Sequence, residues 1–181
     1  MTAPSQPADR ARPQALLQGL GPVLDADTRL IVLGSFPGVA SLRAQGYYAY
    51  PQNHFWKILA ALWGLPLHDM PYTERIDALL AHGLGLWDVY AACEREGSLD
   101  SRIRHGRLND LHGLRARCPR LQAIAHNGAE SHRHARHTQA LGLPVYRLPS
   151  TSPANAGWSF ERKLQAWREV LARHGLAGGA N

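Results

Sequence analysis

The sequence predicts an α/β fold: a three-layer α/β/α sandwich around a central four-stranded parallel sheet. Short apolar runs alternate with segments of helical periodicity, the order that builds parallel strands with helices on both faces. Each apolar run leads into a polar or glycine-rich loop, as strand ends do. Hydrophobic residues make up 45% of the 181 residues, which is enough for one sizeable core.

The strands and helices can be placed by their residue patterns. Strands are expected in four apolar runs: 29–34, 84–89, 121–126 and 144–149. Between them lie segments whose apolar residues recur every three to four positions, and Thr73 and Ser159 are the expected N-caps of two of these. The expected helices are 13–20, 53–63, 74–82, 108–117, 128–140 and 160–174.

A single domain, residues 14–174, is expected between two irregular ends. Residues 1–13 are polar and rich in proline and alanine, so we expect a disordered lead, and residues 175–181 are expected to fray. The lead lacks the apolar core of a signal peptide, and no run approaches 18 apolar residues. We therefore expect a cytoplasmic, intracellular protein that does not bind membranes.

The composition limits the cofactors and partners. Two cysteines, Cys93 and Cys118, are too few for an iron–sulfur cluster and are expected to be buried thiols, so we expect no metal and no cofactor. The net charge of +6 comes almost entirely from arginine and is compatible with nucleic acid binding, although a solvated basic surface gives the same number. Four histidines are expected at the surface: His126, His132, His134 and His137.

Four loops should meet at one crevice. With right-handed crossovers, the loops that follow parallel strands all open at the same edge of the sheet, and ligands bind there. These loops begin at Gly34, Asp88, Asn127 and Ser150. Residues far apart in the chain are therefore expected to form one site.

A glycine turn and a group of aromatic rings form the first of these loops. Gly34-Ser-Phe-Pro-Gly38 allows a ligand to approach the backbone closely, although an ordinary connection has the same pattern. Residues 47–56 add rings and a carboxamide, without the Gly-Lys-Ser/Thr of a phosphate loop. The rings either pack in the core or stack on a flat, hydrogen-bonding ligand such as a nucleobase.

Amides and hydroxyls in the other loops have two interpretations each. Asn53 either caps the following helix or orients a water molecule or a base. Asn127 either forms a turn or reads the edge of a base with its amide. Residues 148–155 are either a plain connector or a loop whose hydroxyls bind phosphate and whose Pro153-Ala154 tip enters a base stack.

Together these motifs resemble the uracil-DNA glycosylase superfamily, and within it the hypoxanthine-DNA (deoxyinosine) glycosylase group called family 6. The similarity runs in the family's order over roughly residues 28–170 and is specific only when the motifs are taken jointly. The resemblance implies the same three-layer fold. The matching segments are Gly34–Gly38, Ser41-Leu42, Tyr47–Trp56, Leu86–Val89, Cys93–Ser101, Asn127-Gly128 and Leu148–Ala154.

The resemblance also implies roles for individual residues. The first loop has no acidic residue to activate water, and family 6 members place a catalytic asparagine at the position of Asn53. Tyr50 stands where many relatives have histidine. The implied substrate-binding residues are Gly34, Ser35, Phe36, Tyr48 and Asn127. The implied DNA-binding residues are Gly38, Ser41, Ser150, Thr151, Ser152, Pro153, Ala154 and Asn155.

The activity implied by the resemblance is hydrolysis of an N-glycosidic bond. A monomeric, monofunctional glycosylase would flip hypoxanthine, with uracil as a further candidate substrate, out of double-stranded DNA and release it. The sugar passes through an oxocarbenium-like state, for which positioned donors and a placed water suffice when the base is a good leaving group. Two other hypotheses remain: a damaged-DNA-binding module without turnover, and a hydrolase of nucleosides or other small molecules.

Overall fold

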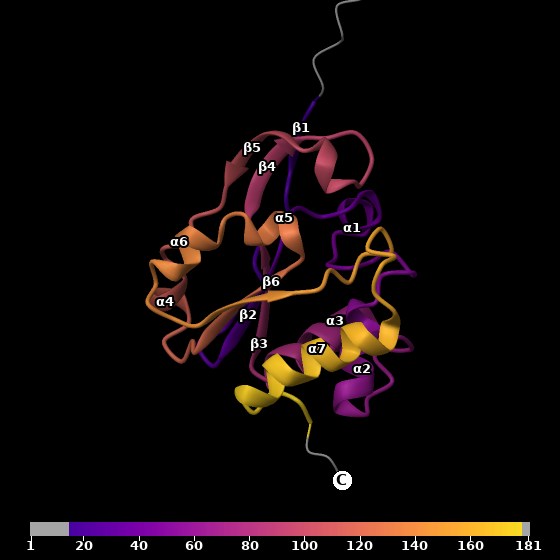
Figure 1. Cartoon of the computed structure of the whole chain (residues 1–181), viewed down its shortest axis with the longest axis vertical. Helices are drawn as coiled ribbons and strands as arrows, with labels where there is room; N and C mark the ends of the chain where they lie inside the picture. Colours follow the sequence, from indigo (N-terminus) through magenta and orange to yellow (C-terminus); the bar gives the residue numbers. More distant parts are fainter. Residues whose placement is uncertain (1–14, 179–181) are drawn as a thin grey trace, which may run out of the picture.

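The computed structural model describes residues 15–178, so the predicted lead at 1–13 lies outside the described part. Four parallel strands form the central sheet in the order β3-β2-β6-β7 (Figure 1). The four predicted strands are confirmed, with ends shifted by one or two residues. They are β2 (Leu30–Gly34), β3 (Leu84–Asp88), β6 (Ala123–Asn127) and β7 (Val145–Leu148).

Helices cover both faces of this sheet, which confirms the predicted three layers. Along β2, Leu30 and Val32 point into one core, and Ile31 and Leu33 into the other. Strands buried on both faces account for the continuous apolar runs in the sequence. The first core packs against α2 (Phe55–Trp63), α3 (Tyr72–Ala81) and α7 (Phe160–Arg173), and the second against α4 (Leu114–Arg117).

A second sheet that the sequence did not predict lies next to the first one. Its antiparallel strands run in the order β1-β4-β5 (Figure 1). The predicted helix at 13–20 is wrong over its described part, because β1 (Leu16–Gln18) pairs along β4 (Tyr90–Glu94). The predicted helix at 108–117 shrinks to α4, because Leu108 ends strand β5 (Arg104–Leu108). In both segments tertiary pairing overrides helical periodicity.

The predicted helix at 128–140 is broken into α5 (Ala129–His132) and α6 (Ala135–Gln139). The break lets two hydroxyls reach one buried ring: His126 lies 2.8 Å from the Ser131 Oγ and 2.9 Å from the Thr138 Oγ1. His126 is therefore fully buried, not at the surface as predicted, and burial lowers its pKa to about 4. His132, His134 and His137 are half-buried.

The ends of the described chain differ from the expectation as well. Residue 174 is not the end of the packed structure, because Leu176 is buried in the core and its carbonyl accepts a hydrogen bond from the Trp63 Nε1. Cys93 and Cys118 are both buried, as expected. Among the described residues, no helix is long and apolar enough to cross a membrane.

Only one of the two predicted N-caps is confirmed, and it is Ser159. Its Oγ accepts a hydrogen bond from the Arg162 N–H, whereas α3 starts after Pro71 without a side-chain cap. Ser159→Ala is expected to lower the free energy of unfolding by about 1 kcal/mol, because one N–H of α7 loses its acceptor. Thr73→Ala is the matched control and should leave it unchanged in urea denaturation. Equal losses in the two variants would contradict this assignment.

Candidate active site

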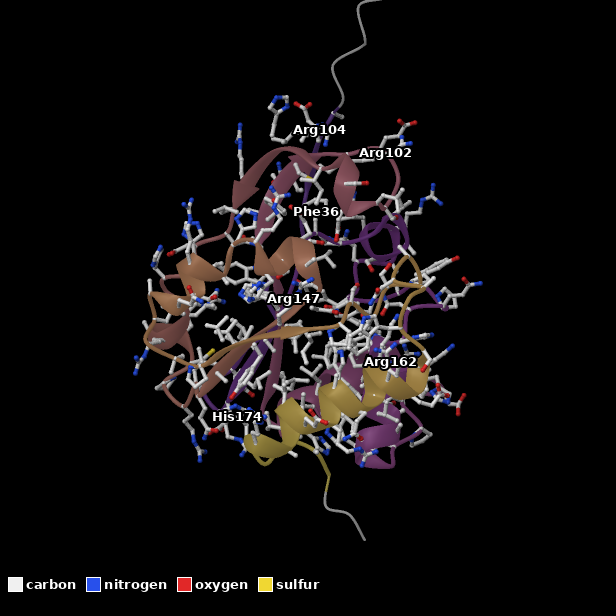
Figure 2. All side chains as sticks on the ribbon, in the orientation of Figure 1. Phe36, Arg102, Arg104, Arg147, Arg162 and His174 are labelled. Atoms are coloured by element: carbon white, nitrogen blue, oxygen red, sulfur yellow. The ribbon has the colours of Figure 1, made fainter. Side chains whose placement is uncertain are left out.

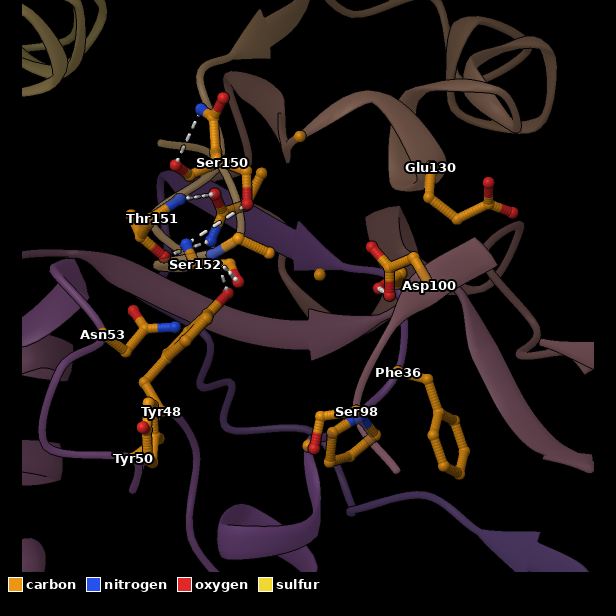
Figure 3. Close-up of a pocket in the computed structure, with 18 of the residues that line it drawn as sticks. Phe36, Tyr48, Tyr50, Asn53, Ser98, Asp100, Glu130, Ser150, Thr151 and Ser152 are labelled. Carbon is orange, nitrogen blue, oxygen red and sulfur yellow. Dashed lines mark hydrogen bonds between the residues drawn. The ribbon is translucent and has the colours of Figure 1, made fainter. Parts of the chain in front are cut away.

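One pocket of about 1190 Å³ opens at the carboxyl edge of the parallel sheet. The strand ends Gly34, Asp88 and Asn127 line it, together with the loop after β7, as the topology predicted. Figure 3 shows the side chains at its wall. All the predicted site residues line this pocket: Gly34, Ser35, Phe36, Gly38, Ser41, Tyr48, Asn53, Asn127 and Ser150–Asn155.

Tyr48 is held in a strained conformation at the pocket wall. Its φ of 55° lies in the left-handed region, which costs a non-glycine residue about 1–3 kcal/mol. One face of its ring stacks on Phe55, with centroids 4.0 Å apart, and its hydroxyl accepts a hydrogen bond from the Asn127 Nδ2. Strain that is maintained by two specific contacts is typical of a functional position.

Asn53 lies beside Tyr48, on the same side of the pocket as Ser150–Ser152 (Figure 3). Its Oδ1 accepts a hydrogen bond from the Phe55 N–H at 3.0 Å, so it helps to cap α2. The carboxamide oxygen keeps a second lone pair, and the Nδ2 donates no hydrogen bond to another described residue. Both interpretations from the sequence, a cap and a pocket-facing amide, are therefore compatible with the geometry.

Asn127 fastens the β7 loop to the end of β6. Its Nδ2 donates to the Tyr48 hydroxyl at 3.1 Å and to the Thr151 Oγ1 at 2.9 Å, and its Oδ1 accepts from the Thr151 N–H. Both amide hydrogens are thus engaged. For a ligand, this leaves one acceptor lone pair on Oδ1 rather than a donor and an acceptor.

The Ser150–Asn155 loop is held from behind by buried groups. The His54 N–H donates to the Thr151 carbonyl at 3.0 Å, which joins this loop to the start of α2. The Lys163 Nζ, buried on α7, donates to the Ser152 carbonyl at 3.2 Å. Pro153 and Ala154 remain exposed at the tip. Hydrogen bonds therefore hold this loop in place as one side of the pocket, and its exposed tip is apolar.

The first loop presents its backbone to the pocket more than its side chains. The Phe36 ring is buried under the three-stranded sheet and points away from the pocket (Figure 3), so the side chain itself is core. The buried Arg95 guanidinium donates to the Pro37 carbonyl and lies over the Phe36 ring. The N–H groups of Phe36 and Gly38 donate no hydrogen bond to another described residue. They remain available to a ligand.

The structure also brings carboxyl groups to the pocket that sequence reasoning missed. Asp88 lines it from the end of β3 and is 4% exposed. Burial, and less strongly the Asp100 carboxylate, raise the pKa of Asp88 to about 8, against the opposing charge of Arg95. Asp100 accepts a hydrogen bond from the Ser35 hydroxyl at 2.6 Å, and Glu130 lines the pocket beside it (Figure 3).

The sequence did indicate Asp88, because one of the four loops predicted to meet at the crevice begins at this residue. Asp100 lies within the matched segment Cys93–Ser101, but no role was assigned to it, because it belongs to the connection between two strands of the unpredicted sheet, in the short 3₁₀ helix η1 (Asp100–Arg102). Within residues 15–178, no group of three His, Cys, Asp or Glu side chains is arranged to hold a metal ion.

Gly34 makes room for the Asp88 carboxyl. A Cβ on Gly34 would overlap the Asp88 Oδ1 and touch the Tyr48 hydroxyl. Gly34→Ala should therefore lower the free energy of unfolding by about 1–3 kcal/mol, as overpacking does. Gly157→Ala is the control, because a Cβ there meets nothing within 4 Å. Thermal denaturation checks both, and a Gly34→Ala variant as stable as the control would refute this packing.

Comparison with known proteins identifies the family. The model of the uracil DNA glycosylase superfamily matches residues 22–171. The chain belongs to this superfamily. Within the superfamily, it is 38% identical over 157 residues to a protein from Methanosarcina acetivorans named hypoxanthine DNA glycosylase, an alignment that covers 87% of this chain and 98% of that protein. A protein of the same name from Methanosarcina barkeri is 35% identical, with 86% and 98% covered.

A solved structure from the superfamily has the same fold. The solution NMR structure of a Methanosarcina acetivorans protein, provisionally described as a uracil DNA glycosylase, superimposes with a TM-score of 0.78. The two chains are 36% identical, and the match covers 88% of this chain and 98% of the other. The family and the fold implied by the resemblance of the sequence motifs are thereby confirmed.

Proposed function

We propose that this superfamily member is a monofunctional DNA N-glycosylase that flips hypoxanthine out of double-stranded DNA and hydrolyses its N-glycosidic bond. The proposal rests on the two relatives, which are both named hypoxanthine DNA glycosylase. The alignment covers 98% of the length of each of them. Uracil, which carries the same lactam edge, is the expected second substrate. The enzyme would act as a monomer on DNA inside the cell.

The charges around the pocket support DNA as the substrate. Three exposed arginines line its wall: Arg43, Arg133 and Arg147. Arg147 lies at the centre of the face shown in Figure 2, with Arg102 and Arg104 above it near the three-stranded sheet. Cations placed in this way would bind the phosphates that flank an extruded nucleotide.

The pocket supplies the parts that this chemistry needs. A flipped base would stack on the free face of the Tyr48 ring. Asn53 would align the attacking water with the free lone pair of its amide oxygen. The Phe36 and Gly38 N–H groups would donate hydrogen bonds to the base as negative charge develops on it. The Ser150–Asn155 loop would bind the backbone, and its Pro153-Ala154 tip would fill the vacated space.

A panel of oligonucleotides tests the proposal. Each duplex carries one altered base, and release is scored by alkaline cleavage under single-turnover conditions. Release of hypoxanthine is the expected result. Salt-dependent binding without release would indicate a DNA-binding module instead, and release from free nucleosides alone would indicate a small-molecule hydrolase.

A further inference from the structure

Within residues 15–178, the buried Asp88 carboxyl has no hydrogen-bond partner. Asp88 ends β3 opposite Gly34 of β2, and its Oδ1 occupies the space that a Cβ on Gly34 would fill. Neither carboxyl oxygen is hydrogen-bonded to another described residue, and Oδ2 is completely buried. A buried polar group without a partner lowers stability, so its presence at a pocket calls for a ligand.

The surroundings of Asp88 favour its neutral form. The charged groups that act on it are Asp100 in η1 and Arg95, the residue after β4, and the buried Tyr47 and Tyr48 come from the loop before α2. Its pKa of about 8 follows mainly from burial. A neutral carboxylic acid has one O–H donor, whereas a carboxylate has none. Asn127 cannot take this role, because both of its amide hydrogens are already engaged.

We propose that Asp88, as the neutral acid, donates a hydrogen bond to the carbonyl oxygen that deamination creates on the base. That oxygen is O6 of hypoxanthine or O4 of uracil. This inference rests on the proposed function and names the group that recognises its substrate class. The free lone pair of the Asn127 Oδ1 would accept the adjacent ring N–H, so the lactam edge meets one donor and one acceptor.

The same hydrogen bond would assist departure of the base. As the bond between C1′ and the ring nitrogen breaks, its electron pair moves onto the base and charge accumulates on the carbonyl oxygen. A donor at that oxygen therefore binds the transition state more strongly than the ground state. Water adds its oxygen to C1′ and loses a proton, and the released base takes up a proton. Asp88 keeps its own proton throughout.

The test compares wild type, Asp88→Asn and Asp88→Ala on one hypoxanthine duplex from about pH 6 to pH 10. Wild-type release should fall about tenfold per pH unit above pH 8, as the donor ionises. Asp88→Asn keeps a donor that does not titrate, so its rate should hold where the wild-type rate falls. Asp88→Ala has no donor and should release base about 10²-fold more slowly at pH 7. Asp69→Asn, at an exposed site, is the control and should match wild type.

Three results would overturn the inference. Hypoxanthine itself loses a proton in alkali, which could also lower the rate of base release. A fall of the wild-type rate above pH 8 therefore supports the proposal only if Asp88→Asn does not show it. Identical pH profiles for the two proteins would contradict the proposal. Carboxyl ¹³C NMR of the free protein should show one resonance that titrates near pH 8 and is missing in Asp88→Asn, and titration near pH 4 would contradict it too. If wild type releases neither hypoxanthine nor uracil, the proposed function fails, and this inference fails with it.

Discussion

Replacing Asn53 by alanine should lower the single-turnover rate of base release by about 10²–10⁴-fold, the usual contribution of a group that positions or activates the attacking water. Affinity for the DNA should change little, because the exposed arginines and the Ser150–Asn155 loop remain in place. The measurement is release of hypoxanthine from a duplex at saturating enzyme, with binding measured separately by fluorescence anisotropy. Full residual activity would refute the assignment.

A second variant separates catalysis from capping. The Asn53 Oδ1 accepts a hydrogen bond from the Phe55 N–H, so Asn53→Ala should also lower stability by about 1 kcal/mol. Asn53→Ser retains an oxygen that can cap α2 but has no carboxamide. It should unfold like wild type in urea and still release base as slowly as Asn53→Ala. Recovery of activity in the serine variant would show that Asn53 is only a cap.

Tyr48→Ala has the second largest expected effect. It removes the ring against which the base would stack, and stacking contributes about 1–3 kcal/mol per base. The measured quantity is the ratio of the single-turnover rate constant to the enzyme concentration that gives half-saturation. The stacking energy corresponds to a loss of about 5- to 150-fold in this ratio. Duplexes with and without hypoxanthine should bind the variant with more similar affinities than they bind wild type.

Tyr48→Phe is the matched control for the ring. It keeps the stack on Phe55 and loses only the hydroxyl that accepts from the Asn127 Nδ2. Most activity should therefore remain, with a loss of stability of about 1 kcal/mol. If phenylalanine is as damaging as alanine, the hydroxyl and its link to the β7 loop matter more than the stacking face.

The parallel sheet was predictable because its strands are buried on both faces. Leu30–Leu33 and Ala123–Ala125 have no exposed side, so each is a short apolar run that ends at a polar loop. The smaller sheet was not predictable in this way. All five residues of β5 are exposed, and β1 has too few buried residues to show a period. Their pairing with β4 comes from backbone hydrogen bonds that leave little trace in the side chains.

The site was predicted to the extent that motifs and topology specify it. The loops beginning at Gly34, Asn127 and Ser150 meet because parallel strands end at one edge, and this follows from their order alone. Two details depend on neighbours that no motif specifies. Both Asn127 amide hydrogens are engaged, and the Phe36 ring points away from the pocket into the core. The same is true of the raised pKa of Asp88, which depends on its burial and on the nearby Asp100 carboxylate.

A crystal structure with a hypoxanthine duplex tests the central claim most directly, with a 2′-fluorinated sugar that resists hydrolysis. The base should lie in the pocket against the Tyr48 ring, with its carbonyl oxygen within hydrogen-bonding distance of Asp88 and a water molecule held between Asn53 and C1′. A hypoxanthine that stays stacked in the duplex, or one bound elsewhere on the protein with this pocket empty, would contradict the account.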